Sequence, residues 1–327
     1  MKVLITGASG MLGRATAQSM LSRGDEVTVL QRRPSGLACR EVLGDVADPH
    51  VAARAVRGQD AVIHLAAKVD VIGPWSEYEH ANIRGTRTVV DACRAHGVGR
   101  LVHVSSPSVA HSGSALVGAG AEAADPERAR GHYSRSKAVA ELAALEADST
   151  SLAVLVIRPH LVWGPGDTQL VGRIIDRARA GRLPVIGSGA ALIDTTYVDN
   201  AAGALVAAVD VCGPVHGEPL VVSNGEPRPV AEILRRLCRS AGVPGPRGRV
   251  PLPAAWAAGA AVEALWARTH RRSTPPLTRF LAVQLATAHW FDQRRTRTAL
   301  RWSPEVGLDE GFSRLAAWYG CAASAAH

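Results

Sequence analysis

The chain has 327 residues, of which 47% are hydrophobic, enough to build a full core in one large domain or two smaller ones. Its 37 lysines and arginines exceed its 29 acidic residues, so the formal net charge is +8. No basic run is interleaved with aromatic residues, which favours a solvated, arginine-rich surface over a nucleic-acid-binding one. The composition therefore predicts a globular enzyme that binds no nucleic acid.

Cysteine usage and the N-terminal segment bear on compartment and metal binding. Five cysteines lie at scattered positions without a C-x-x-C spacing, which argues against a disulfide framework and a zinc site. The opening segment MKVLITGASG is typical of a strand entering a glycine turn, and it lacks the long apolar region of a signal peptide. No apolar stretch reaches the roughly 18 residues of a membrane span. We expect a cytoplasmic protein with no metal site and no integral membrane span.

Short apolar runs alternate with helical stretches through the first half of the chain. This alternation is typical of β-α-β units that form a parallel sheet. It predicts an α/β fold with a doubly wound parallel sheet of the Rossmann type. The expected strands are 2–7, 26–32, 40–46, 60–67, 100–106 and 152–159. The expected helices are 11–23, 49–57, 78–96 and 133–147.

The alternation breaks after Pro159. We expect helices at 167–181 and 198–210, a short strand in LPVIGSG, and a returning strand at 219–225. The rest of the chain is helical, with interruptions rich in proline and glycine. This pattern predicts a smaller C-terminal substrate lobe that interleaves with the dinucleotide-binding domain. The predicted Rossmann domain is 1–165, with 195–225 returning to it, and the predicted substrate lobe is 166–194 and 226–327.

One apolar stretch stands apart, LPAAWAAGAAVEALWA at 252–267. It contains Glu263 and is followed by Arg268, His270, Arg271 and Arg272. Such a stretch is more typical of a core helix. The alternative is a helix that rests on a membrane surface, which would make the protein peripherally associated.

Three glycines follow the first predicted strand at regular spacing. Gly7, Gly10 and Gly13 lie between the strand that ends at Thr6 and the helix behind it. This arrangement directs backbone N–H groups and a helix N-terminus toward a pyrophosphate. Glycines also serve turns and tight packing, but the strand, turn and helix together favour a dinucleotide site.

The end of the second strand bears on the choice of cofactor. Dinucleotide-binding folds often place an acid there to bind the ribose hydroxyls, whereas this chain has Gln31 followed by Arg32 and Arg33. Guanidinium groups attract a 2′-phosphate, so we expect NADP(H) to be preferred and NAD(H) to be the alternative. Both arginines can also be plain surface residues. Asp45, just past the third strand, is placed either to meet the adenine ring or to form a turn.

The segment HYSRSKAVAE contains Tyr133 and Lys137, four residues apart. On a helix this spacing is about one turn, so both side chains point into the same space. An ammonium group beside a phenol favours the phenolate and lowers the pKa of the tyrosine. The pair therefore predicts a proton donor or acceptor that works near neutral pH.

Taken together, these motifs resemble the extended short-chain dehydrogenase/reductase family, within the NAD-dependent epimerase/dehydratase superfamily. The resemblance covers essentially the whole chain through TGASGMLG, GDV, DAVIHLAA, NIRGT, YSRSK, RPHLVWGPGD and DTTYVDNAAGA. Closer similarity in VSSPSV, in TTYVDN and in the tail at 290–319 is to the 3β-hydroxysteroid dehydrogenase branch. That branch includes bacterial reductases of long-chain 2-alkyl-3-keto acids.

The resemblance implies roles for individual residues. Tyr133 corresponds to the acid/base, Lys137 to its partner and a ligand of the ribose hydroxyls, and Ser106 to the hydroxyl that binds the substrate oxygen. Ser106 lies at the C-terminal edge of the fifth predicted strand, where open parallel sheets bind their ligands. Ser105 is the adjacent competitor for this role and Ser108 a weaker one.

The resemblance also marks positions around the cofactor. Ala66 and Ala67 let the backbone approach it, Pro159 lines the nicotinamide side, and Asn82 sits where the family often has an asparagine near the active site. The full set expected to bind the cofactor is Gly7, Gly10, Met11, Leu12, Gly13, Gln31, Arg32, Arg33, Asp45, Val46, Leu65, Ala66, Ala67, Asn82, Lys137 and Pro159.

These features imply an NAD(P)-dependent oxidoreductase that interconverts a ketone and a secondary alcohol with a Tyr/Lys/Ser mechanism. Five of the seven tryptophans fall in the C-terminal lobe, and aromatic walls favour a bulky apolar substrate. A 3β-hydroxysteroid-like ring system and a long-chain 3-keto acid both fit this expectation. In the family, helices such as 78–96 and 133–147 commonly form a dimer seam, so the resemblance also implies a homodimer.

Two other function classes compete with this interpretation. A nucleotide-sugar epimerase or dehydratase that retains its NAD would share the scaffold. Its diphosphate could be clasped by four arginines whose spacing is also typical of a solvated helix face, namely Arg173, Arg177, Arg179 and Arg182. A non-catalytic cofactor-binding protein would need no Tyr-x-x-x-Lys pair, so the intact pair argues against that class.

Overall fold

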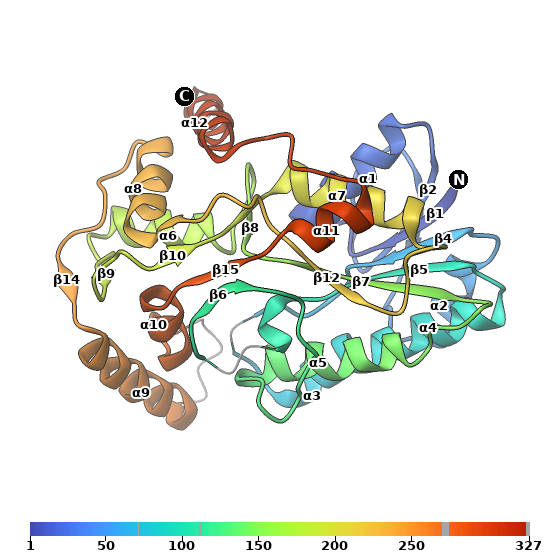
Figure 1. Ribbon diagram of the computed structural model, residues 1–327, viewed down its shortest axis with the longest axis horizontal. Helices are drawn as coiled ribbons and strands as arrows, with labels where there is room; N and C mark the ends of the chain where they lie inside the picture. The colour runs from blue at the N-terminus through green and yellow to red at the C-terminus, as the bar shows by residue number, and fades with distance from the viewer. Residues whose placement is uncertain (71, 111–112, 270–274, 325–327) are drawn as a thin grey trace.

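A seven-stranded parallel sheet forms the centre of the computed structural model, which describes residues 1–70, 72–110, 113–269 and 275–324 (Figure 1). The strands lie in the order β12-β7-β5-β4-β1-β2-β3. In chain order they are β1 (Lys2–Thr6), β2 (Glu26–Gln31), β3 (Arg40–Leu43), β4 (Ala61–His64), β5 (Arg100–Val104), β7 (Ala153–Pro159) and β12 (Pro219–Val222).

Helices cover both faces of this sheet because its strands are apolar on both sides. One face packs against α1 (Met11–Ser22) and α7 (Val198–Val211), which supply Ala17, Met20 and Leu205 to a shared core. The opposite face packs against α2 (Pro49–Val56), α4 (Gly85–Ala95) and α5 (Gly131–Leu145). The two groups lie on opposite sides of the sheet in Figure 1. The predicted doubly wound α/β fold is confirmed.

The strand order places a switch point between β1 and β4. From β1 the chain proceeds outward through β2 and β3, and from β4 it proceeds the other way through β5 and β7. Ligands of open parallel sheets bind at the carboxyl ends of the strands, at such a point. Thr6 and His64 are paired there as the last residues of β1 and β4, so the loops that follow both strands begin side by side, and we expect the ligand cleft between them.

The single helix expected over 78–96 is divided into three parts. A short α3 (Trp75–Tyr78) leads into the π-helical turn η1 (Glu79–Arg84), and α4 follows without a break. Wide turns of this kind are rare and occur frequently at functional sites. Here the turn carries Asn82, which is 1% exposed, beneath the loop that follows β4.

A second, four-stranded sheet with the order β13-β10-β15-β6 was not predicted from the sequence. Its strands have only two to four residues, too short for a period-two pattern to be recognised. They are β6 (Leu116–Ala119), β10 (Leu192–Ile193), β13 (Arg228–Pro229) and β15 (His289–Phe291). β6 comes from within 1–165 and pairs with β15 from near the end of the chain.

Two further strand pairs and seven helical segments complete the described chain. The strand pairs are β8 (Val162–Trp163) with β11 (Thr196–Tyr197), and β9 (Val185–Ile186) with β14 (Arg249–Val250). The helical segments are η2 (Pro107–Val109), α6 (Val171–Arg179), α8 (Val230–Ser240), α9 (Leu252–Thr269), α10 (Arg279–Ala286), α11 (Arg294–Leu300) and α12 (Leu308–Ser324). Trp163 stacks on Phe312, with ring centroids 4.7 Å apart, at the centre of the lobe's core.

The apolar stretch expected at 252–267 forms α9, which packs against α10 through the buried Ala255. Its other sides face solvent, with Trp256 45% and Leu265 48% exposed. The helix is therefore a core helix on one side only. Across the described ranges, we find no helix with both the length and the apolar character needed to cross a membrane. The basic residues at 270–272 lie outside the described residues.

Candidate active site

The glycine turn approaches the loop after β4 too closely for side chains. Gly7 has a φ of +80°, and a Cβ atom there would lie 2.9 Å from the Ala66 nitrogen. A Cβ on Gly13 would lie 2.4 Å from the Gly7 oxygen. Gly10, the N-cap residue of α1, provides no side-chain cap, so the first N–H groups of the helix are left for a ligand. This cradle fits the pyrophosphate of a dinucleotide.

A buried hydrogen-bond network fixes the loop that carries Leu65 and Ala66. The Thr6 hydroxyl accepts hydrogen bonds from both of their amides, at 3.1 and 3.0 Å. It must then donate to His64 Nδ1, 2.8 Å away. Because the Thr86 hydroxyl donates to a carbonyl, it accepts from His64 Nε2 at 3.0 Å. Burial lowers the pKa of His64 to about 3, which keeps this tautomer neutral.

Sequence reasoning missed Thr6, His64 and Thr86. The available signal was polar residues at the ends of otherwise apolar strands, since Thr6 and His64 end β1 and β4 and both are buried. A buried polar side chain needs a partner, so two at neighbouring strand ends indicate a shared network.

Asn82 connects the same loop to the helix of Tyr133. Its side-chain oxygen accepts from the Lys68 amide at 2.6 Å, and its nitrogen donates to the Lys68 carbonyl at 3.1 Å and to the Ser136 hydroxyl at 2.9 Å. Ser136 in turn donates to the carbonyl of Tyr133 at 2.8 Å. In this structure Asn82 positions protein groups, and its predicted contact with the cofactor stays a prediction.

The structure brings Ser106 and Tyr133 together. The Ser106 hydroxyl lies near enough to the Tyr133 hydroxyl to lower the pKa of the tyrosine, and Ser106 Oγ lies 3.0 Å from Ser108 Oγ. Ser105 is different, because its hydroxyl is buried and has no hydrogen-bond partner among the described residues. Of the two adjacent candidates, the geometry favours Ser106 as the partner of Tyr133.

Lys137 lies one helical turn from Tyr133 and is 3% exposed. Its ammonium donates to the Val104 carbonyl at 2.6 Å and lies 3.4 Å from His103 Nε2. Burial lowers the pKa of Lys137 to about 8, although the charge of Glu141 acts in the opposite direction. Lys137 therefore lies in the cleft with its proton held less firmly than usual.

The pKa of Tyr133 does not follow the expectation from the sequence. Burial raises it above its ordinary value, and the hydrogen bond with Ser106 offsets only part of that rise. The expected lowering by Lys137 is not among the causes of this shift. In this structure the lysine ammonium donates to the Val104 carbonyl.

The end of β2 is organised around Glu41. This carboxylate accepts hydrogen bonds from Gln31 Nε2 at 3.2 Å and from the amide and hydroxyl of Ser35, which lower its pKa. Arg14 donates to the Ser35 carbonyl. The loop from 32 to 36 is thereby fixed beside α1. Arg14 directly follows Gly13 in sequence and was missed as a candidate.

Two exposed arginines lie on the same loop, Arg32 and Arg33. Neither forms an ion pair with an acid in the described parts of the chain. With Arg14 they place three guanidinium groups at the end of β2, the position of the ribose in dinucleotide-binding sheets.

Asp45 forms a turn, which is one of the two roles expected from the sequence; the other, contact with the adenine ring, stays a prediction. Its carboxylate accepts from the Ala47 amide at 2.9 Å and pairs with His80 at 2.9 Å. Burial would raise the pKa of Asp45, but these two hydrogen bonds outweigh it and lower the pKa. Val46 packs against Gly85, where a Cβ would lie 2.9 Å from its side chain.

The opposite wall of the cleft follows Pro159, the last residue of β7. His160 contacts the rings of His289 and Phe291, at centroid distances of 5.0 and 4.9 Å. Both partners lie on β15, so the second sheet reaches the nicotinamide side expected for Pro159. The four arginines suggested as a diphosphate clasp are spread along and beyond α6, and Arg179 and Arg182 are exposed.

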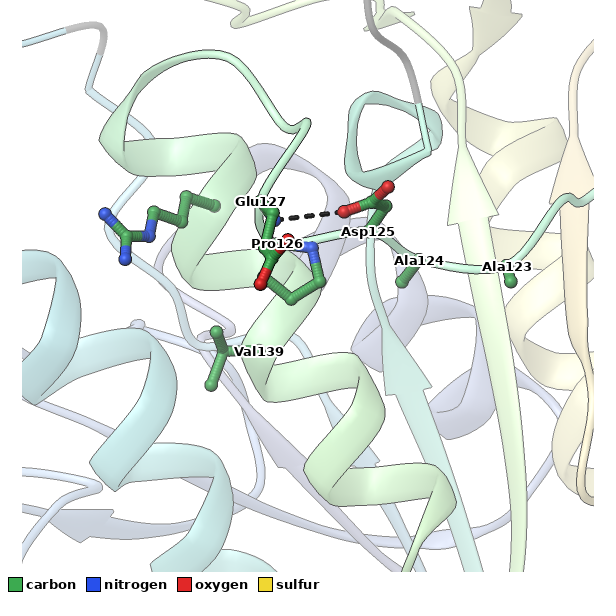
Figure 2. A pocket seen from close by; sticks show the side chains of 7 residues that line it. Ala123, Ala124, Asp125, Pro126, Glu127 and Val139 are labelled. Atoms are coloured by element: carbon green, nitrogen blue, oxygen red, sulfur yellow. Dashed lines mark hydrogen bonds between the residues drawn. The ribbon is translucent and has the colours of Figure 1, made fainter.

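A pocket of about 600 Å³ lies on another face of α5 (Figure 2). It is lined by Ala123, Ala124, Asp125, Pro126, Glu127, Arg135 and Val139. Arg135 and Val139 each follow one of the candidate residues by two positions, which places them on the far side of the helix from Tyr133 and Lys137. This pocket is therefore separate from the catalytic cleft.

The 3-beta hydroxysteroid dehydrogenase/isomerase family matches residues 4–253 of the chain. The chain belongs to this family. A 2-alkyl-3-oxoalkanoate reductase of Stenotrophomonas maltophilia is 41% identical, over 97% of this chain and 99% of the relative. A 3 beta-hydroxysteroid dehydrogenase/Delta 5-->4-isomerase of Mycobacterium tuberculosis is 30% identical, over 97% of this chain and 90% of the relative.

Solved structures agree with this fold. UDP-glucuronic acid 4-epimerase from Bacillus cereus, in complex with NAD, superposes with a TM-score of 0.75 and covers 98% of this chain and 99% of its own. The structure of gox2253 gives a TM-score of 0.77, with 98% of each chain covered. Their identities of 19% and 24% show a shared fold alone.

Family membership and the assembled site establish the class of reaction. The chain is an NAD(P)-dependent oxidoreductase of the short-chain dehydrogenase/reductase type that interconverts a ketone and a secondary alcohol. The epimerase alternative fits less well, because its support comes from structures that share the fold alone.

Proposed function

We infer that the chain reduces a bulky, apolar 3-keto compound, with Ser106, Tyr133 and Lys137 as the catalytic residues. The proximity of the Ser106 and Tyr133 hydroxyls carries this proposal, because it creates one place where a carbonyl oxygen can meet two O–H groups. The 41% identity to a 2-alkyl-3-oxoalkanoate reductase supports a long-chain 3-keto acid ahead of a steroid-like ring system.

In this mechanism the nicotinamide ring supplies the hydride. The substrate oxygen replaces part of the Ser106–Tyr133 contact and accepts a hydrogen bond from each hydroxyl. Tyr133 then gives its proton to that oxygen, and the raised pKa of Tyr133 keeps the proton available at neutral pH. Lys137 holds the ribose hydroxyls and stabilises the tyrosinate left behind.

NADP(H) is the proposed cofactor. The glycine turn at 7–13 would hold the pyrophosphate, and the arginines at the end of β2 would hold the 2′-phosphate. A phosphate gains charge-assisted hydrogen bonds from guanidinium groups. The absence of an ion pair for Arg32 and Arg33 among the described residues supports this, since both remain available to an anion.

The walls near the catalytic residues support an apolar substrate. Pro107, Leu116 and Phe291 line a small cavity beside the end of β5 and β7, together with the polar Glu122 and Arg158. The tryptophans of the lobe contribute less than the sequence suggested, since Trp256 and Trp318 are more than 40% exposed. Apolar lining therefore comes mainly from β6 and β15.

A homologous series of 3-keto acids tests the proposal. Each buried methylene contributes up to about 0.8 kcal/mol, so kcat/KM with NADPH should rise severalfold for every two added carbons until the pocket is full. UDP-sugars without added cofactor serve as the comparison. A flat series, or turnover of UDP-sugars alone, contradicts the proposal and supports the epimerase.

The proposal extends to the oligomeric state and the location of the protein. The outward face of α5 presents Leu142, 42% exposed, three residues after Val139, which lines the pocket of Figure 2, and we propose a homodimer seam there. All five cysteines are free, which supports the reducing environment of the cytoplasm. The exposed apolar side chains of α9 could also rest on a membrane surface, and vesicle flotation would measure whether the protein associates peripherally with a membrane.

A further inference from the structure

A buried ion pair lies next to the catalytic helix. Arg158 donates to Glu141 through Nε at 3.0 Å and through Nη2, and the two side chains are 1% and 0% exposed. Arg158 also donates to the Glu122 carbonyl at 2.7 Å. Burying two charges costs several kcal/mol per ion, and well-packed apolar residues often replace such a pair without loss of stability. A stabilising role alone therefore does not account for it.

The pair connects two parts of the active site. Glu141 lies on α5 four residues, about one helical turn, after Lys137, so the two side chains share a face of the helix. Arg158 lies on β7 directly before Pro159, at the nicotinamide side. The carboxylate is thus held between the catalytic lysine and the strand that forms the opposite wall.

The surroundings of Lys137 contain little that would hold a positive charge. His103 on β5 and His64 on β4 are neutral, since burial lowers the pKa of each. The turn η1 contributes the uncharged amide of Asn82, and α5 itself contributes Tyr133. Glu141 is the acid whose charge raises the pKa of Lys137 in the described structure, against the effect of burial.

We propose that Glu141 is a positioning residue for the reaction, whose carboxylate, fixed by Arg158, holds Lys137 in the ammonium form at the floor of the cleft. Arg158 orients the carboxylate and limits its field, so that the lysine proton is retained without an ion pair that would draw the ammonium away from the Val104 carbonyl. This inference rests on the proposed role of Lys137.

The chain offers a direct test because it contains only three lysines, Lys2, Lys68 and Lys137. Lysine labelled with ¹³C and ¹⁵N gives three side-chain signals, assigned with Lys2→Arg and Lys68→Arg. Glu141→Gln keeps the shape and a hydrogen-bond acceptor for Arg158 while removing the charge. We expect the titration midpoint of Lys137 to fall by about one pH unit or more.

Glu146→Gln is the matched control, because Glu146 is an exposed acid at the end of the same helix. It should leave the midpoint within about 0.3 pH units, since solvent screens exposed charges. An unchanged midpoint in Glu141→Gln overturns the proposal. So does a variant that loses thermal stability and kcat while the midpoint stays in place, because that result describes a purely structural pair.

A double variant covers the case in which Glu141→Gln does not fold. Glu141→Gln with Arg158→Met leaves neither partner of the ion pair buried alone, and the Lys137 midpoint should lie below that of the wild-type protein. A midpoint equal to or above the wild-type value overturns the proposal. The titration needs no substrate, so it judges Glu141 separately from the proposed function. If a 3-keto acid is turned over, the alkaline limb of kcat/KM should move with the midpoint.

Discussion

Ser105 and Ser106 are neighbours of the same type, and only the backbone geometry decides which of them faces Tyr133. Both follow β5 directly, and the sequence offers no difference in type between them. Successive residues of an extended chain point in opposite directions, so only one can face the cleft. In the structure Ser106 meets Tyr133, whereas the Ser105 hydroxyl is buried without a partner among the described residues.

This difference predicts unequal effects of two neighbouring substitutions. Ser106→Ala should lower kcat by about 10²–10³-fold, because one donor to the substrate oxygen is lost. Ser105→Ala should change kcat by less than about threefold, since its hydroxyl bonds to no described residue. Steady-state kinetics with NADPH and a 3-keto acid measures both. Equal losses would mean that the assignment of Ser106 is wrong.

Tyr133 carries the proton in the proposed mechanism. Tyr133→Phe should retain the fold and cofactor binding and lower kcat by about 10²–10⁴-fold, the usual contribution of general acid catalysis. Circular dichroism and NADPH fluorescence titration check the first two properties. A phenylalanine variant with near-normal kcat would refute the proton role.

The cofactor preference depends on charge at the end of β2. Arg32→Ala with Arg33→Ala should raise the Kd for NADPH at least tenfold and leave the Kd for NADH nearly unchanged, because only the 2′-phosphate is lost as a partner. Arg40→Ala is a matched control, since Arg40 is an exposed arginine at the start of β3, away from the carboxyl edge of the sheet. Equal weakening for both cofactors contradicts the proposed phosphate site.

At the scale of elements, long periodic segments were predictable and short or irregular ones were not. The strands of the large sheet and helices α1, α2, α5 and α7 lie within a few residues of their expected positions. The turn η1 was missed because an apolar pattern does not distinguish a π-helical turn from an α-helical one. The second sheet was missed because its pairing depends on β6 and β15, which lie about 170 residues apart in the chain.

The connection between β10 and β11 contains a buried acid, Asp194. Its carboxylate accepts hydrogen bonds from the Ser223 hydroxyl at 2.5 Å and from the Glu226 amide at 3.3 Å, and it joins the lobe to the end of β12. Burial raises its pKa from 3.8 to about 6, despite these hydrogen bonds. Asp194 is therefore protonated in the folded chain at a pH where the unfolded chain has lost the proton.

This shift fixes the sign of a pH effect on stability. The folded state binds an extra proton between about pH 4 and pH 6, so the contribution of Asp194 is largest at low pH and is lost as the pH rises through 6. Relative to Asp194→Asn, the wild-type free energy of unfolding should be greater at pH 5 than at pH 8 by about 1 kcal/mol. Urea denaturation of both proteins measures this difference. A difference of the opposite sign would contradict the assignment.

At the scale of the whole molecule, the fold class could be predicted because it follows from the alternation of strands and helices along the first half of the chain, and the glycine turn because its motif spans a few residues. The catalytic and cofactor-binding roles of individual residues stay predictions. The tertiary network around Thr6, His64 and Asn82 could not be predicted, since its members come from three elements and have no shared spacing. The division into 1–165 with 195–225, and 166–194 with 226–327, stays a prediction. β6 and β15 cross it, because they pair within one sheet.

The proposed homodimer gives a prediction at this scale. The protein should sediment as a dimer at micromolar concentration, and Leu142→Glu should shift it to the monomer, because a charge would be placed in an apolar seam. Leu192→Glu is the matched control, an exposed leucine of the lobe that is 37% exposed. Analytical ultracentrifugation measures all three proteins. A monomeric wild-type protein would rule out the seam on α5.

The network beneath the glycine turn has a consequence for alignment in the proposed reaction. One series of hydrogen bonds runs from the amides of the β4 loop through Thr6 to His64, and another runs from Asn82 through Ser136 to the backbone of Tyr133. The loop beside the proposed cofactor site and the helix that carries Tyr133 are thus held by the same few hydrogen bonds. In the proposed mechanism the hydride donor and the proton donor would therefore be held in a fixed position relative to each other, and a ketone that fits between them would be aligned with both at once.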